Sequence, residues 1–257
     1  MSEAELPSVE SAAARIRFDH VGKSYRRRQL KSVLLKDVLR GVRTSEDSSD
    51  RFWALDDVSF TIRERETVAV LGQNGSGKST TLSLCAGSSH PTVGRVSVRG
   101  RIAPVLALGV GFQPDMTAPE NAYVNASLLG VSREELSGRL EQILAFAELG
   151  DFVHSPVRHY STGMTARLGF AVAMHVDADI LLIDEVLAVG DGAFQAKCLQ
   201  RIGTLRAEGR TMMFITHDLL TAQRVCTRGI WMREGKIELD DDIERCVREY
   251  RTYLETR

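Results

Sequence analysis

The chain has 257 residues, with 33 basic and 34 acidic side chains and a formal net charge of −1. This length accommodates one sizeable core with at most a small subdomain, and the balanced charge excludes a global field that would attract nucleic acid or an anionic membrane. The apolar runs fall far short of the ~20 residues that span a bilayer, and the start lacks a signal-peptide pattern, which predicts a cytoplasmic location.

The N-terminal part is predicted to contain three strands and an insertion. Residues 1–14 are polar and Ala-rich, which favours a disordered terminus, and the expected strands are residues 15–18, 58–62 and 67–71. Residues 26–50 form a basic insertion with leucines at spacings compatible with an amphipathic helix. Such a helix can bind anionic headgroups or a loop of a membrane protein, although a charge run is more often a solvated face.

The third strand runs directly into VLGQNGSGKST at residues 70–80, which has the spacing G-x-x-x-x-G-K-S before a helix start. Glycines let the backbone N–H groups turn inward around phosphates, Lys78 reaches the outer phosphates, and the Ser79 hydroxyl can bind Mg²⁺. The helix N-terminus adds positive potential at the same place. The pattern predicts a nucleoside triphosphate site made of Gly72, Gln73, Asn74, Gly75, Ser76, Gly77, Lys78, Ser79 and Thr80.

The middle of the chain is predicted to form two extended segments and then a helical subdomain of approximately residues 115–175. The expected strands are residues 96–98 and 102–108, and the expected helices are residues 119–128 and a segment that begins at Ser132. Thr117 and Glu120 have the spacing of a capping box. The second helix places apolar side chains on one face, namely Leu136, Leu140, Ile143 and Leu144.

From residue 161 onward, helices and buried strands alternate, which is typical of an α/β sheet. The expected elements are a helix from residue 161, strands 180–184, 212–216, 230–232 and 236–239, a helix over 194–206, and a helix after residue 216. The strand ILLIDE ends in two acids at the carboxyl edge of the sheet, where open α/β sheets bind ligands. There Asp184 suits the magnesium shell, and Glu185 is placed to polarise the attacking water. His217 follows another apolar strand, so we expect it at the same edge, bonding the terminal phosphate or orienting Glu185.

The segment YSTGM at residues 160–164 resembles the signature, usually LSGGQ, of nucleotide-binding subunits of ATP-binding cassette (ABC) transporters. The resemblance covers nearly the whole chain. It implies an α/β fold, a P-loop NTPase ABC nucleotide-binding domain over residues 15–257, with a mixed sheet core, an antiparallel β subdomain and a helical subdomain. It also implies hydrolysis of ATP with Mg²⁺. Without the resemblance, the segment reads as a helix start capped by Ser161.

The same resemblance implies a head-to-tail homodimer in which the signature of one subunit closes over the ATP held by the other. The residues carried over are Ser161, Thr162, Gly163 and Met164, where Met164 lacks the side-chain donor of the usual glutamine. Asp191, in AVGD, matches the loop that crosses the dimer interface.

Two further assignments follow from the resemblance. Gln113, in GFQPDM, matches the glutamine that joins the core to the helical subdomain and senses Mg²⁺, although by itself it is equally an exposed turn residue. Adenine is expected to stack on Tyr25, with Phe52 and Trp53 as competitors for that role.

Within the family, residues 53–60, 100–123, 160–173 and 181–198 resemble the ATPases of polysaccharide exporters, and VLAVGD is the most specific phrase. This implies a lipid-linked glycan of the O-antigen, capsule or teichoic-acid type, carried across the bacterial inner membrane by a separate permease with this subunit peripheral on the cytoplasmic face. Nucleic acid is not an expected partner. The alternatives are an exporter of another substrate, such as a lipid or drug, and a soluble ABC ATPase. The ~100 residues of a C-terminal glycan-recognising sandwich are not expected here.

Overall fold

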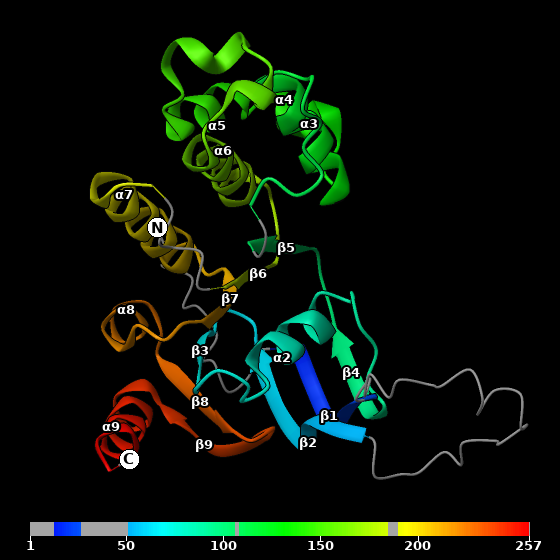
Figure 1. The fold of residues 1–257 in the computed structure, drawn as a ribbon, viewed down its shortest axis with the longest axis vertical. Coiled ribbons are helices and arrows are strands. Elements are labelled where there is room, and N and C mark those ends of the chain that lie inside the picture. The colour runs from blue at the N-terminus through cyan, green and yellow to red at the C-terminus, as the bar shows by residue number, and fades with distance from the viewer. Residues whose placement is uncertain (1–12, 27–50, 106–107, 185–189, 257) are drawn as a thin grey trace, which may run out of the picture.

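The computed structural model describes residues 13–26, 51–105, 108–184 and 190–256 (Figure 1). A three-stranded antiparallel sheet in the order β2-β1-β4 is formed by β1 (Ala14–Arg26), β2 (Arg51–Arg63) and β4 (Val93–Val98). Its inner face is apolar, and the rings of Phe18 and Phe60 stack across β1 and β2 with centroids 4.5 Å apart. Because β1 begins at Ala14 and ends at Arg26, it includes the first residue of the expected insertion; residues 27–50 lie outside the described part.

The central sheet has six strands in the order β5-β6-β7-β3-β8-β9. These are β5 (Ile102–Val105), β6 (Ile180–Ile183), β7 (Thr211–Ile215), β3 (Thr67–Leu71), β8 (Arg228–Arg233) and β9 (Lys236–Asp242). The first five are parallel and β9 is antiparallel. Strands β3, β6 and β7 are buried along their whole length, as expected for parallel strands covered on both faces. The predicted α/β class with a mixed sheet core is confirmed.

Alternate side chains of the central strands enter two different hydrophobic clusters. Ala69 and Leu71 belong to the cluster shared with the helices, whereas Val68 and Val70 belong to the cluster shared with the antiparallel sheet. This alternation follows from the two-residue period of a strand. The central sheet is therefore the layer that joins the helical part to the antiparallel part.

The helices fall into two groups. The sheet is flanked by α2 (Lys78–Cys85), α7 (Gly192–Ala207), α8 (Leu219–Val225) and α9 (Ile243–Glu255). The helical subdomain contains α3 (Ala118–Leu128), α4 (Arg133–Ser137), α5 (Leu140–Ala147), the short 3₁₀ helices η3 (Gly150–His154) and η4 (Val157–His159), and α6 (Thr162–His175). Figure 1 shows this subdomain at one end of the molecule, away from β1, β2 and β4. No helix in the described part of the chain is both long and apolar enough to cross a membrane.

Three local predictions differ from the structure. The segment after Ser132 forms two helices instead of one, because Gly138 and Arg139 interrupt it and the Arg139 N–H turns back to donate to the Leu136 carbonyl at 2.8 Å. The strand expected to reach residue 108 is described as β5 from Ile102 to Val105; residues 106–107 lie outside the described part, and Leu108 is in a turn. Helix α9 was not expected, although Ile243, Cys246, Val247 and Tyr250 give it an apolar stripe at helical spacing.

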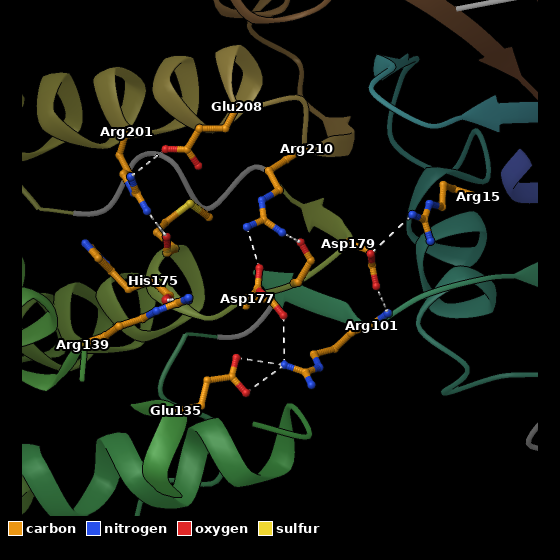
Figure 2. A network of polar contacts seen from close by, with 12 residues as sticks. Arg15, Arg101, Glu135, Arg139, His175, Asp177, Asp179, Arg201, Glu208 and Arg210 are labelled. Atoms are coloured by element: carbon orange, nitrogen blue, oxygen red, sulfur yellow. Dashed lines mark hydrogen bonds and ion pairs between the residues drawn. The ribbon is translucent and has the colours of Figure 1, made fainter. Parts of the chain in front are cut away.

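The C-terminal end of α6 is held by an arginine cluster, which we define as Arg101, Arg139, Arg201 and Arg210 (Figure 2). Each guanidinium donates to a different carbonyl of residues 174–178, as follows: Arg201 to Met174 at 3.1 Å, Arg139 to His175 at 2.8 Å, Arg101 to Asp177 at 3.1 Å, and Arg210 to Ala178 at 2.8 Å. Cations are favourable at a helix C-terminus, where carbonyls lack helical partners. Arg101 also pairs with Glu135 of α4 at 3.1 Å, so the cluster connects the helical subdomain to the central sheet.

Candidate functional site

The loop of residues 72–80, called the phosphate loop below, joins β3 to α2. Gly72 (φ 147°) and Gly77 (φ 107°) have backbone conformations that favour glycine. A Cβ on Gly72 would lie 2.4 Å from the Met232 carbonyl oxygen, and one on Gly77 would lie 2.6 Å from Leu55 Cδ2. Glycine is therefore required at both positions by conformation and by space.

Lys78 is buried, and its ammonium group turns back over the loop. The Nζ atom donates to the carbonyls of Gly72 at 2.7 Å and Gln73 at 3.0 Å. Gly77 occupies the N-cap of α2, and within the described residues no side chain caps this helix. The first N–H groups of a helix have no partner in the helix itself and attract anions. The loop thus presents a buried cation and a helix N-terminus at one place.

A cavity of about 250 Å³ lies in front of this loop. Its described lining consists of Phe52, Ala54, Asn74, Gly75, Gly77, Lys78, Ser79, Thr80, Asp184 and Ile215. Asp184 follows β6 and Ile215 ends β7, and these strands lie beside β3 in the order β6-β7-β3. The structure therefore places Asp184 at the cavity that Lys78 and Ser79 also line, at the sheet edge where the strand pattern predicted it.

The aromatic residues near the cavity occupy different positions. Phe52 lines the cavity, and Tyr25, which pairs with it across β1 and β2, is not among the described lining residues. Directly opposed residues share a face of a sheet, so Tyr25 lies on the same face as Phe52. Trp53 packs on Gly22, where a Cβ would come within 2.8 Å of the indole. Geometry therefore favours Phe52, one of the two competitors, over Tyr25.

The remaining residues of the carboxyl edge are only partly described. His217 is exposed and lies between β7 and Asp218, the N-cap of α8. The Asp218 carboxylate accepts from the Leu220 and Thr221 N–H groups at 3.0 and 3.3 Å. The hydrogen bond from the Thr221 hydroxyl is the main cause that holds the pKa of Asp218 below its usual range. Glu185 lies outside the described residues, so its role stays a prediction.

The signature segment starts α6 as its local sequence predicted. Ser161 is the N-cap, and its Oγ accepts from the Met164 N–H at 3.1 Å. Thr162 and Gly163 form the first turn, and Met164 packs against the hydrophobic cluster of the helical part. None of the four is among the described residues that line the cavity.

Asp191 caps the neighbouring helix and joins it to α6. Its carboxylate accepts from the Phe194 N–H at 2.9 Å and from Arg167 of α6 at 2.9 Å. The Phe194 N–H, followed by the charge of Arg167, holds the pKa of Asp191 below its usual range. The signature helix and the loop before α7 are thus connected within one chain.

Gln113 is exposed and is not among the described lining residues of the cavity. Its loop is organised by Asn121, a buried side chain to which the sequence analysis assigned no role. Asn121 Oδ1 accepts from the Gln113 N–H at 2.6 Å, and Nδ2 donates to the carbonyls of Gln113, Met116 and Thr117 at 3.0 to 3.1 Å. An asparagine one position after a capping-box glutamate was the only local signal for this arrangement.

Comparison with known proteins agrees with this geometry. Residues 55–188 match the family model described as ABC transporter. The chain is 43% identical over 238 residues to the O-antigen export system ATP-binding protein RfbB of Klebsiella pneumoniae, covering 92% of this chain and 97% of that protein. It is 37% identical over 240 residues to the teichoic acids export ATP-binding protein TagH of Listeria innocua, covering 93% of this chain and 70% of that protein.

A solved structure also matches at the level of the fold. The dimeric post-hydrolysis state of the ATP-binding cassette MJ0796 bound to ADP and Pi aligns with a TM-score of 0.69 and 25% identity, over 89% of this chain and 98% of that one. The resemblance inferred from the motifs is confirmed. With its phosphate loop, its cavity and these relatives, the chain belongs to the ABC transporter family as an ATP-binding, ATP-hydrolysing subunit.

Proposed function

We propose that this chain powers the export of a lipid-linked polysaccharide, of the O-antigen, capsule or teichoic-acid type, across the bacterial inner membrane through a separate permease. The identity of 43% to an O-antigen export ATP-binding protein over 97% of its length carries the proposal. Similarity to a teichoic acids export protein supports the same class of cargo. The subunit is expected on the cytoplasmic face of the membrane, bound to the permease.

The residues that line the cavity are proposed to have different roles in binding the nucleotide. Lys78 and the N-terminus of α2 are proposed to hold the phosphates, because Lys78 is buried at the start of this helix and lines the cavity together with Ser79. Ser79 and Asp184 line the same cavity with a hydroxyl and a carboxylate, the hard oxygen ligands that Mg²⁺ prefers. When bound, the ion would neutralise phosphate charge. Gln113 remains a predicted ligand only.

The residues proposed to promote hydrolysis follow strands at the carboxyl edge of the central sheet. Glu185 follows Asp184 directly and is proposed to orient the attacking water, because phosphoryl transfer depends on positioning more than on covalent chemistry. His217 is proposed to bond the terminal phosphate or orient Glu185, since it follows β7, whose Ile215 lines the cavity.

Phe52 is proposed as the aromatic side chain that stacks on the base of the nucleotide. It lines the cavity and is 46% exposed, so its ring has a free face for stacking. Tyr25, on the same face of the sheet, is proposed to border the base instead of covering it. Phe52→Ala is therefore expected to raise the Kd for ATP more than Tyr25→Ala does, measured by calorimetric titration. The reverse order would instead indicate that Tyr25 stacks on the base.

Two copies are proposed to form the complete catalytic unit. In the single chain, the Ser161 Oγ already accepts an N–H, so its own proton remains to donate to a phosphate oxygen held by the partner subunit. The Arg167 to Asp191 contact at 2.9 Å ties this signature helix to the loop assigned to the dimer interface. Movement of the interface is thereby transmitted to the signature.

The test replaces Glu185 by Gln in the native cell, with Glu208→Gln as the matched control, because Glu208 is an exposed glutamate at the end of α7. The expected result for Glu185→Gln is loss of surface glycan with accumulation of lipid-linked glycan inside, while the control exports normally. If surface glycan stays normal although the purified variant has lost its ATPase activity, the assignment as an ATPase stands and the assignment of a glycan cargo is rejected. An exporter of a lipid or drug would then become the leading function.

A further inference from the structure

The phosphate loop rests on the turn between β8 and β9, to which the sequence analysis assigned no role. The Met232 carbonyl occupies the place that a side chain on Gly72 would need. The Gly235 N–H donates to the Ser76 carbonyl at 3.1 Å, and the Gly235 carbonyl accepts from the Asp56 N–H at 2.9 Å. The turn is therefore wedged between the loop and β2, and it fixes the loop backbone at two points.

A second cavity, of about 80 Å³, lies on the other side of the loop. Residues 73–76 form one wall, and Trp231, Arg233 and Tyr253 belong to the opposite side. Asn74 and Gly75 line this cavity and the nucleotide cavity alike, so the apex of the loop is a thin partition between the two. The apex thus has space behind it into which it can move.

Within the described part of the chain, the Ser76 side chain makes no hydrogen bond that would hold the apex on this side. Ser76 lines the second cavity and is 5% exposed, yet its Oγ has no hydrogen-bond partner among the described residues. The backbone bond from Gly235 to Ser76 is the polar contact described above. Lys78 holds the start of the loop through the Gly72 and Gln73 carbonyls, and the position of the apex at Ser76 depends in addition on where the β8–β9 turn is held.

Helix α9 holds that turn through an aromatic cluster. The Trp231 ring lies 5.6 Å from the Tyr250 ring and 5.2 Å from the Tyr253 ring, measured between centroids. The guanidinium of Arg233, which pairs with Glu238 at 3.1 Å, lies 5.6 Å from the centre of the Tyr253 ring. Tyr253 thus contacts the residues on either side of Met232.

Close backbone packing makes α9 and β8 move together. The Cys246 thiol donates to the Gly229 carbonyl at 3.1 Å, and a Cβ on Gly229 would lie 2.7 Å from Cys246 Cβ. Such an approach is possible only where one partner is glycine. A displacement of α9 is therefore passed to β8 and from there to the phosphate loop.

We propose that Tyr253 is a positioning residue for ATP binding, acting through Trp231, Arg233 and the β8–β9 turn on the apex of the phosphate loop. Its ring closes the far side of the second cavity. Without the ring, the apex relaxes into the enlarged space, and its N–H groups no longer converge on the phosphates. Lys78 and Asp184 line the nucleotide cavity and are not among the described lining residues of the second cavity, so nucleotide affinity is expected to change and turnover is not.

The test compares Tyr253→Ala with Tyr253→Phe and with Leu254→Ala, a neighbouring exposed residue of α9. All three are made in a Trp53→Phe background, in which Trp231 is the single remaining tryptophan and reports ATP binding by its fluorescence. Tyr253→Ala is expected to raise both Kd and KM for ATP by about 5- to 10-fold with kcat within about twofold of the background, which is the pattern of lost uniform binding. Tyr253→Phe keeps the ring and is expected to stay within about twofold, as is Leu254→Ala.

Unchanged ATP affinity of a folded Tyr253→Ala variant would overturn the proposal, and so would a fall in kcat at constant KM. If Tyr253→Ala does not fold, Arg233→Met replaces it, because this change removes the cation from the Tyr253 ring and leaves α9 seated on β8. The expected rise in Kd is then about threefold, since the contact between the Tyr253 and Trp231 rings remains. No rise in that variant would equally overturn the proposal.

Discussion

Arg201→Met tests whether the arginine cluster stabilises the end of α6. Arg201 donates from Nε and Nη2 to the Met174 carbonyl at 3.3 and 3.1 Å, and its side chain is 25% exposed. Methionine keeps most of the apolar stem and removes the charge and both donors. A hydrogen bond from a charged group contributes about 1.5–3 kcal/mol, and a cation at a helix C-terminus about 0.3–1 kcal/mol. Allowing for partial exposure, we expect the free energy of unfolding to fall by about 1.5–2 kcal/mol.

The contribution of the charge pair with Glu208 is expected to be much smaller. The Arg201 Nη1 and Glu208 Oε1 atoms are 3.8 Å apart, and the Glu208 side chain is 47% exposed. Exposed pairs of this kind contribute about 0–1 kcal/mol. Glu208→Gln removes the pair and leaves the bonds to Met174 intact, so it should cost less than about 0.5 kcal/mol.

The assay is urea unfolding of both variants, with the midpoint compared at constant m, and thermal melting as a second measure. For a chain of this size, the loss in Arg201→Met corresponds to roughly 3–8 °C in Tm. A loss below about 0.5 kcal/mol in Arg201→Met, or an equal loss in Glu208→Gln, would refute the assignment of stability to the helix-end carbonyl.

Three further outcomes follow from single contacts. Gly77→Ala should abolish ATP binding and lower stability by more than about 2 kcal/mol in urea unfolding, because the new Cβ would lie 2.6 Å from Leu55 Cδ2 at a φ of 107°. The hydrogen bond to Asp57 raises the pKa of His20 above the ordinary value of a histidine, so Asp57→Asn should lower it toward that value in an NMR titration. The pair's contribution to stability is fully present below the unfolded pKa and is lost as pH rises through the raised folded pKa. All four thiols are buried, and burial raises the pKa of Cys198 to about 12, so a disulfide reagent at pH 8 should label the folded chain far more slowly than the denatured one.

Local chemistry explains why much of the site was predictable. The phosphate loop is encoded in nine consecutive residues, and each glycine, Lys78 and Ser79 has a role that depends on spacing alone. The strand before Asp184 is short, apolar and fully buried, so its carboxyl end could be assigned to the sheet edge without coordinates. The capping box at Thr117 and the cap at Ser161 were equally local and are both present.

Assignments that depend on partners distant in the chain were left open by the sequence or were missed. Tyr25 and Phe52 face the same side of their sheet, and only the packing of β1 and β2 against the loop decides that Phe52 lines the cavity. In the sequence, Asn121 looks like an ordinary helix residue. Because its side chain is buried, its amide must find hydrogen-bond partners, and it finds them in the backbone of the loop at Gln113.

By itself the sequence determined the family, the α/β class and the phosphate-binding segment, because these follow from hydrophobic period and from motifs shorter than twelve residues. The tertiary structure alone decided how the loop is supported and how the helical subdomain is attached. Ser76 meets Gly235, and Arg101 meets Asp177, only after the sheet has brought together residues more than 70 positions apart. A long arginine side chain or a turn glycine carries no sequence signal for its partner, so such contacts are set by the packing of the whole fold.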